Sequence, residues 1–111
     1  MKPINVNVKV EVNKNWAGEK YAIFSTEEHG AIAELDWPAG ERTKPRVYPL
    51  KQNEIDGDAT KHVCLSSVPQ GIICAETATR AYLMGLGYYA QKIVYPKEMR
   101  ELRKQAFKEI K

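Results

Sequence analysis

Five β-branched residues stand at every second position from Ile4 to Val12, and polar residues fill the positions between them. Successive side chains of a β-strand point to opposite faces, so this spacing predicts a strand with one buried face and one wet face. Residues 20–26 and 31–37 also have strand composition, and turn-forming residues at 13–18 and 27–30 separate the three segments. The N-terminal third therefore predicts a three-stranded antiparallel meander.

The middle of the chain is rich in turn signals. Two prolines and a glycine within 37–45 predict a loop, because proline cannot donate to a sheet ladder, and a short strand follows at 46–48. Residues 52–60 predict another loop. Strand-like segments at 62–68 and 72–74 flank a Pro-Gln-Gly sequence that is typical of a tight turn, which predicts a second hairpin.

Beyond residue 76 the apolar period changes from two to between three and four, which is typical of a helix lying across a sheet. The pattern predicts one helix over about 77–93, with Thr77 as its N-cap, and a second over about 96–111 that begins at Pro96. The second helix has an apolar stripe at Met99, Leu102, Ala106 and Ile110.

These elements predict one α+β domain over residues 1–111, mainly strands in 1–76 and two helices in 77–111. We expect an antiparallel sheet of five or six strands with the helices packed on it or beside it. The length of 111 residues fits one domain of ordinary size.

Membrane and secretory classes do not fit this sequence. The longest uncharged runs, 63–75 and 81–91, are interrupted by Gly or Pro and fall short of the roughly 20 apolar residues that span a bilayer. No secretory signal pattern is visible at the N-terminus. We expect a cytoplasmic protein that does not enter membranes.

The positive charge of the chain is concentrated at its C-terminal end. Residues 92–111 carry seven basic and three acidic side chains, although the whole chain has a net charge of only +3. On helical spacing, Arg100, Arg103, Lys104 and Lys108 share one face, which predicts a surface that binds an anionic partner. The alternative is a solvated helix end whose basic residues favour the helix dipole.

Three further residues are candidates for partner binding. Trp16 lies in a polar turn, and Tyr48 follows Arg46 after the proline-rich loop. Exposed aromatic rings near positive charge stack on nucleic-acid bases or anchor protein interfaces. The alternative is that these rings close the open ends of the small sheet.

His62, Cys64 and Cys74 raise the question of metal binding or catalysis. Their spacing matches no known zinc or redox signature, and the predicted hairpin would make the two cysteines diagonal neighbours about 7 Å apart. We expect inert thiols, no metal and no cofactor.

The sequence thus favours a small non-catalytic binding module, such as an accessory or inhibitory protein. A protein partner with an acidic surface ranks first, nucleic acid bound by the same basic face ranks second, and a small hydrolase around His62 and Cys64 ranks a distant third. If the strand at 4–12 lies at a sheet edge, it also predicts a homodimer or a complex formed by strand addition.

Overall fold

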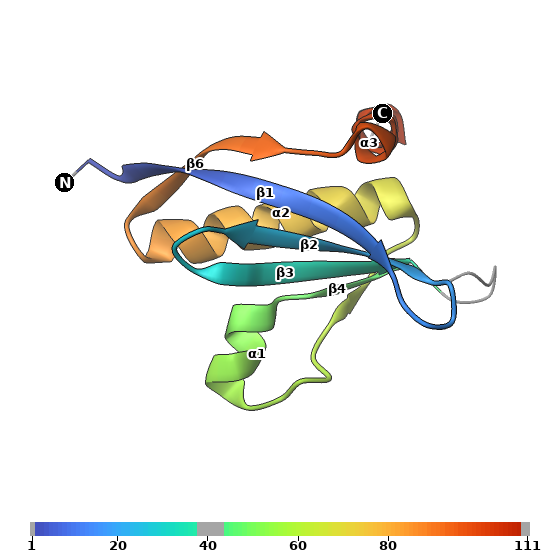
Figure 1. Ribbon diagram of the computed structural model, residues 1–111, viewed down its shortest axis with the longest axis horizontal. Coiled ribbons are helices and arrows are strands. Elements are labelled where there is room, and N and C mark those ends of the chain that lie inside the picture. Colours follow the sequence, from blue (N-terminus) through green and yellow to red (C-terminus); the bar gives the residue numbers. More distant parts are fainter. Residues whose placement is uncertain (1, 38–43, 110–111) are drawn as a thin grey trace.

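The computed structural model of the chain describes residues 2–37 and 44–109 and has an α+β fold (Figure 1), which confirms the predicted class. The elements in chain order are β1 (Ile4–Lys14), β2 (Lys20–Thr26), β3 (Gly30–Trp37), β4 (Arg46–Tyr48), α1 (Leu50–Asp56), β5 (Val63–Cys64), α2 (Val68–Gly85), β6 (Tyr88–Val94) and α3 (Lys97–Glu109). Most of the loop predicted at 37–45 lies outside the described residues, as does Ile110 of the predicted apolar stripe.

Within the described residues, six strands form one sheet in the order β5-β4-β3-β2-β1-β6. Neighbours from β1 to β5 pair antiparallel, so the predicted meander of β1, β2 and β3 is confirmed. In contrast, β6 pairs parallel to β1. The sheet is therefore mixed, and the prediction of a wholly antiparallel sheet is wrong for this last strand.

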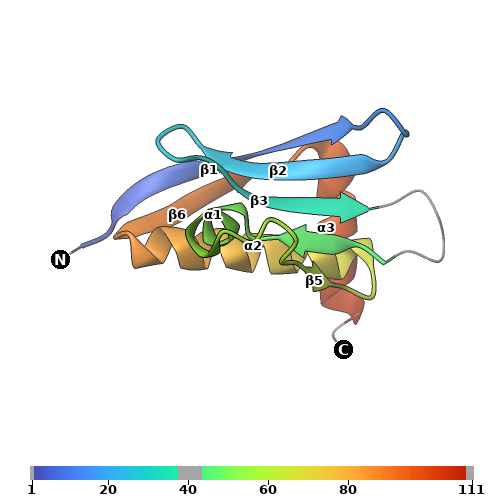
Figure 2. The same cartoon turned by 90° about the horizontal axis from the view of Figure 1, so that it is seen from below.

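The helices lie on one side of the sheet (Figure 2). On β1, Val6, Val8 and Val10 are buried toward this side, while the intervening Asn7 and Lys9 are exposed on the other. In the described part of the chain no helix covers that opposite face. We call it the uncovered face.

The hydrophobic core lies between the sheet and α2. Its largest fully buried apolar side chains are Phe24, Ile32, Leu35, Ile72, Leu83, Met99, Val8 and Val47. The closest approach of helix and sheet is at Gly71 of α2, where an added Cβ atom would lie 2.6 Å from Cδ1 of Leu35 on β3. Glycine at this position therefore allows α2 to pack closely against β3.

The turn and second strand of the predicted second hairpin, residues 68–74, lie in the first half of α2, so that prediction is wrong. Ser67 has extended backbone dihedrals and its side chain accepts a hydrogen bond from the Gln70 amide at 3.3 Å, which makes it the N-cap. Pro69 follows in the first helical turn, where its missing amide hydrogen costs little. Thr77, predicted as the N-cap, lies in the middle of the helix.

The segment predicted as the second half of a helix is the strand β6. The helix ends at Gly85, and Gly87 adopts a left-handed φ of 87° that turns the chain out of the helix. The following residues are largely aromatic and β-branched and pair with β1 from Ile4 to Lys9. The predicted C-terminal helix is confirmed as α3.

Two smaller elements also differ from the prediction. The loop predicted at 52–60 contains part of the short helix α1, whose buried Asn53 donates a hydrogen bond to the Lys61 carbonyl at 3.2 Å. The strand predicted at 62–68 is reduced to the two residues of β5. The described chain therefore has three helices instead of two.

The position of β1 contradicts the premise of the predicted strand-addition site. β1 lies inside the sheet, where β6 pairs with its residues 4–9 and β2 pairs with its residues 9–14. The expectation that this strand forms a sheet edge is therefore wrong, and the predicted homodimer or strand-augmented complex loses that argument.

Candidate functional site

The turn between β1 and β2 presents Trp16 to solvent. The Asn15 side chain orders this turn, because its Oδ1 accepts hydrogen bonds from the amides of Ala17 at 2.9 Å and Glu19 at 3.0 Å. Its Nδ2 also donates to Oε1 of Glu19 at 3.1 Å, and Gly18 takes a left-handed φ of 80°. Trp16 is 99% exposed on this ordered turn. The indole therefore does not close the end of the sheet, which was the alternative explanation for it.

Arg46 and Tyr48 lie on the uncovered face, because Val47 between them is buried toward the helices. The Tyr48 ring lies 5.1 Å from the His62 ring, measured between centroids. Arg46 lies opposite Asp36 of β3 in the antiparallel register. Arg46 and Tyr48, both predicted to bind a partner, are thus half-buried on the uncovered face.

A cavity of about 410 Å³ lies on this surface beside the β1–β2 turn. It is lined by Asn15, Glu19, Lys20, Tyr21, Glu34, Asp36 and Arg46. The lining mixes acidic, basic and aromatic groups. The carboxyl groups of Glu34 and Asp36 were not singled out from the sequence, although their alternate spacing on a predicted strand places them on one face.

The helix α3 carries the predicted basic residues on two different sides. Arg100, Lys104 and Lys108 are exposed. Arg100 donates from Nε to the Tyr95 carbonyl at 3.1 Å, and Lys104 lies 3.7 Å from the Glu101 carboxylate one turn earlier. The first contact is partly buried and the second lies at the surface, and all three side chains remain accessible to a partner. We call Arg100, Lys104 and Lys108 the basic stripe.

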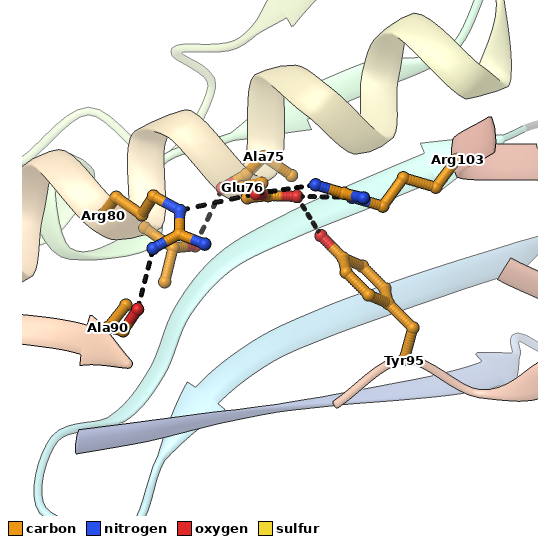
Figure 3. Close-up of polar contacts among 7 residues, drawn as sticks. Ala75, Glu76, Arg80, Ala90, Tyr95 and Arg103 are labelled. Atoms are coloured by element: carbon orange, nitrogen blue, oxygen red, sulfur yellow. Dashed lines mark hydrogen bonds and ion pairs between the residues drawn. The ribbon is translucent and has the colours of Figure 1, made fainter. Parts of the chain in front are cut away.

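Arg103 is held differently, as Figure 3 shows. Its guanidinium donates to both oxygens of Glu76 on α2, at 2.8 Å from Nε and 3.2 Å from Nη2. The guanidinium also lies over the rings of Tyr95 and Phe107, at 5.6 Å and 5.2 Å from their centroids. Its charge is thus compensated within the protein.

Glu76 is the centre of this network (Figure 3). It is buried and accepts a hydrogen bond from the Tyr95 hydroxyl at 2.6 Å, and Nε of Arg80 lies 3.4 Å from its Oε1. Burial alone would raise the pKa of Glu76, but the hydrogen bonds and charges of its partners outweigh burial and lower it. Burial and the bond to Glu76 raise the pKa of Tyr95. Glu76 is therefore an ionised carboxylate that joins α2 to α3.

The opposite side of α3 holds the helix to the domain. Met99 and Ala106 are fully buried, and Leu102 packs against the core. Within the described residues, the apolar stripe therefore packs against the domain. Phe107, at the margin of the stripe, is 50% exposed next to the basic stripe.

The two cysteines do not lie across a hairpin as predicted. Cys64 is exposed on β5, whereas Cys74 is half-buried on α2. His62 contacts the Thr60 carbonyl through Nδ1 at 2.6 Å and is itself exposed. Among residues 2–37 and 44–109 no three His, Cys, Asp or Glu side chains are grouped so as to hold a metal ion.

Comparison of the chain with known protein families, curated proteins and solved structures returns no match. No helix in the described residues is both long and apolar enough to cross a bilayer. We therefore infer a function from the geometry of the chain alone.

Proposed function

We propose that the protein is a non-catalytic binding module of the cytoplasm, and that it docks on an acidic surface of another protein. The observation that carries the proposal is the exposure of Trp16, which is 99% accessible on a turn fixed by five side-chain and main-chain hydrogen bonds of Asn15. Tryptophan is enriched among the residues that dominate binding energy at protein interfaces.

The energetic argument concerns the indole. Removing about 200 Å² of aromatic surface from water at about 25 cal/mol per Å² yields roughly 5 kcal/mol. Because the backbone of the turn is already ordered, little backbone entropy is lost when the ring is buried by a partner. A fully exposed tryptophan on an ordered turn is thus well suited to anchor an interface.

The basic stripe supplies the preference for an acidic partner. Lys20 at the start of β2 pairs with Glu98 in the first turn of α3 at 3.1 Å, so the Trp16 turn and α3 lie at the same end of the molecule (Figure 1). Positive charge beside an aromatic anchor attracts an acidic surface and orients it during encounter. Arg46 adds a further cation on the uncovered face at this end.

The experiment is affinity capture from lysate of the source cell with the wild-type protein and two variants, followed by mass spectrometry. Trp16→Ala removes the anchor, and Ile55→Ala is the matched control because Ile55 is an 80% exposed apolar residue on α1. We expect a captured protein that Trp16→Ala weakens by tenfold or more, equivalent to about 1.4 kcal/mol, and that Ile55→Ala retains.

Two outcomes would contradict the proposal. Equal capture by wild type and Trp16→Ala would show that Trp16 does not anchor the interface. Capture that disappears after nuclease treatment, with affinity falling steeply as salt is raised, would instead assign a nucleic acid as the partner of the basic stripe.

A further inference from the structure

Glu34 and Asp36 lie two residues apart on β3, so both side chains project from the uncovered face. Each is partly buried, and both line the cavity of about 410 Å³ beside the β1–β2 turn. Two carboxyl groups that are close together and partly removed from water cannot both ionise without repulsion. This geometry raises the question of how the pair is compensated.

Asp36 has an unsatisfied atom. Its Oδ1 is buried, and no donor among the described residues makes a hydrogen bond to it. A buried acceptor without a donor costs about 1 to 3 kcal/mol. The side chains that face the pair are the candidate donors to this atom.

The groups that face the pair come from the strands β2 and β4 and from the β1–β2 turn. On β2, Tyr21 lies opposite Asp36 and Ile23 lies opposite Glu34. On β4, Arg46 lies opposite Asp36 and Tyr48 lies opposite Glu34. The charged groups at the rim of the cavity are Glu19 and Lys20, of which Lys20 is paired with Glu98.

None of the facing groups compensates Asp36. In the described part of the chain no hydrogen bond or ion pair joins Asp36 to Tyr21, Lys20 or Arg46. Among the described side chains that face Asp36, the other candidate donor is Glu34, whose carboxyl group donates a hydrogen bond only when it carries a proton. A protonated Glu34 carboxyl group would thus supply the hydrogen bond that Oδ1 of Asp36 lacks.

We propose that Glu34 and Asp36 bind one proton between them in the folded protein, and that loss of this proton makes the β3–β4 end of the sheet less stable. Burial, the hydrogen bond to Asp36 and the Asp36 charge together raise the pKa of Glu34 to about 7. The proton is therefore released near neutral pH, where small changes in pH alter its occupancy.

The direction of the effect follows from proton linkage. In the unfolded chain Glu34 has its ordinary pKa of 4.5, whereas in the folded protein it is about 7. Between these values the folded state binds more protons than the unfolded state, so stability falls as pH rises through this window. The two carboxylates then repel each other on the uncovered face.

The test has two measurements. Carbon-13 NMR of labelled glutamate carboxyl groups in the wild-type protein should show Glu34 titrating near pH 7, well above the ordinary value of 4.5. Thermal melting between about pH 5 and about pH 8.5 should show a lower Tm for wild type as pH rises. Glu34→Gln should lose this fall, because its amide donates to Asp36 at every pH.

The matched control is Glu11→Gln on the same face, since Glu11 is exposed and paired with Lys9 at 2.7 Å. Its melting curve should follow that of wild type. A Glu34 carboxyl group that titrates at its ordinary pKa would overturn the proposal, and so would identical pH dependence in wild type and Glu34→Gln. If Glu34→Gln does not fold, the NMR titration of the wild-type protein still decides.

Discussion

The Arg103 guanidinium of α3 donates two hydrogen bonds to the buried Glu76 carboxylate of α2, from Nε at 2.8 Å and from Nη2 at 3.2 Å. Paired bonds of this kind match the planar fork of arginine to a carboxylate and fix their relative orientation. Arg103 therefore helps to hold the terminal helix, while the basic stripe beside it faces solvent.

The first prediction separates these two roles. Arg103→Ala should lower the free energy of unfolding by about 1 to 3 kcal/mol, because it leaves the buried Glu76 carboxylate short of two hydrogen bonds. Lys104→Ala, on the exposed side of the same helix, should change it by less than about 0.5 kcal/mol. Urea denaturation measures both, and equal effects would show that the Arg103–Glu76 contact does not stabilise the fold.

The second prediction concerns acid. Glu76 has a lowered pKa in the folded protein, so its ionised form contributes stability above its ordinary value of 4.5, and this contribution is lost as pH falls through the lowered value. Arg103 makes the main contact that lowers this pKa, so Arg103→Ala should lose less of its stability than wild type as pH falls through this range. Melting temperatures recorded over the acidic range test this prediction. The same dependence of melting temperature on pH in wild type and Arg103→Ala would contradict it.

The third prediction compares two glycines of α2. Gly71→Ala should cost about 1 to 3 kcal/mol, because its Cβ atom would lie 2.6 Å from the fully buried Leu35 side chain. Gly85→Ala meets no atom within 4 Å and should be neutral or stabilise by up to about 1 kcal/mol. Chemical denaturation of the two variants is the measurement. A stabilised Gly71→Ala protein would mean that the helix does not pack closely on β3.

The fourth prediction concerns thiol reactivity. Cys64 is exposed, whereas partial burial raises the pKa of the Cys74 thiol and lowers its thiolate population. Cys64 should therefore react with an alkylating reagent on the order of tenfold faster or more. Mass spectrometry of timed samples resolves the two sites, with Cys64→Ser as the control, and comparable rates at both sites would refute the burial of Cys74.

The sequence predicts local pairing well and long-range pairing poorly. The meander follows from alternation within β1, β2 and β3, whose neighbours are joined by short turns. The parallel pairing of β1 with β6 joins Val6 to Ala90, and no local period reports a partner so distant in the chain. The spacing of apolar residues favoured a helix through this region, whereas pairing with β1 makes its second half a strand.

The error at α2 has a local cause. Pro69 and Gly71 are typical of a turn, yet Pro also suits the first turn of a helix that follows a serine N-cap. The capping role of Ser67 was the signal that distinguishes the two. Gly71 has no left-handed backbone, and glycine is needed there because a Cβ atom would collide with Leu35.

The sequence predicted the part of the candidate site that lies on one helix, but not the contacts between separate elements. The helical spacing of basic residues indicated which residues share a helix, and the exposed stripe follows from it. Spacing alone does not report that Glu76 on another helix faces Arg103, nor that Asp36 lacks a donor. Such relationships depend on how separate elements pack, which only the folded structure reveals.

The placement of β1 between β2 and β6 also dictates an order of events while the chain is being synthesised. The meander can pair as soon as β3 has left the ribosome, but the β1 edge that pairs with β6 has no partner until β6 has also been synthesised. An unpaired strand edge is a template for association with other chains. Until β6 emerges, the nascent protein must therefore keep this edge from pairing with other molecules. Slow translation of the segment before β6 should increase aggregation without changing the stability of the folded protein.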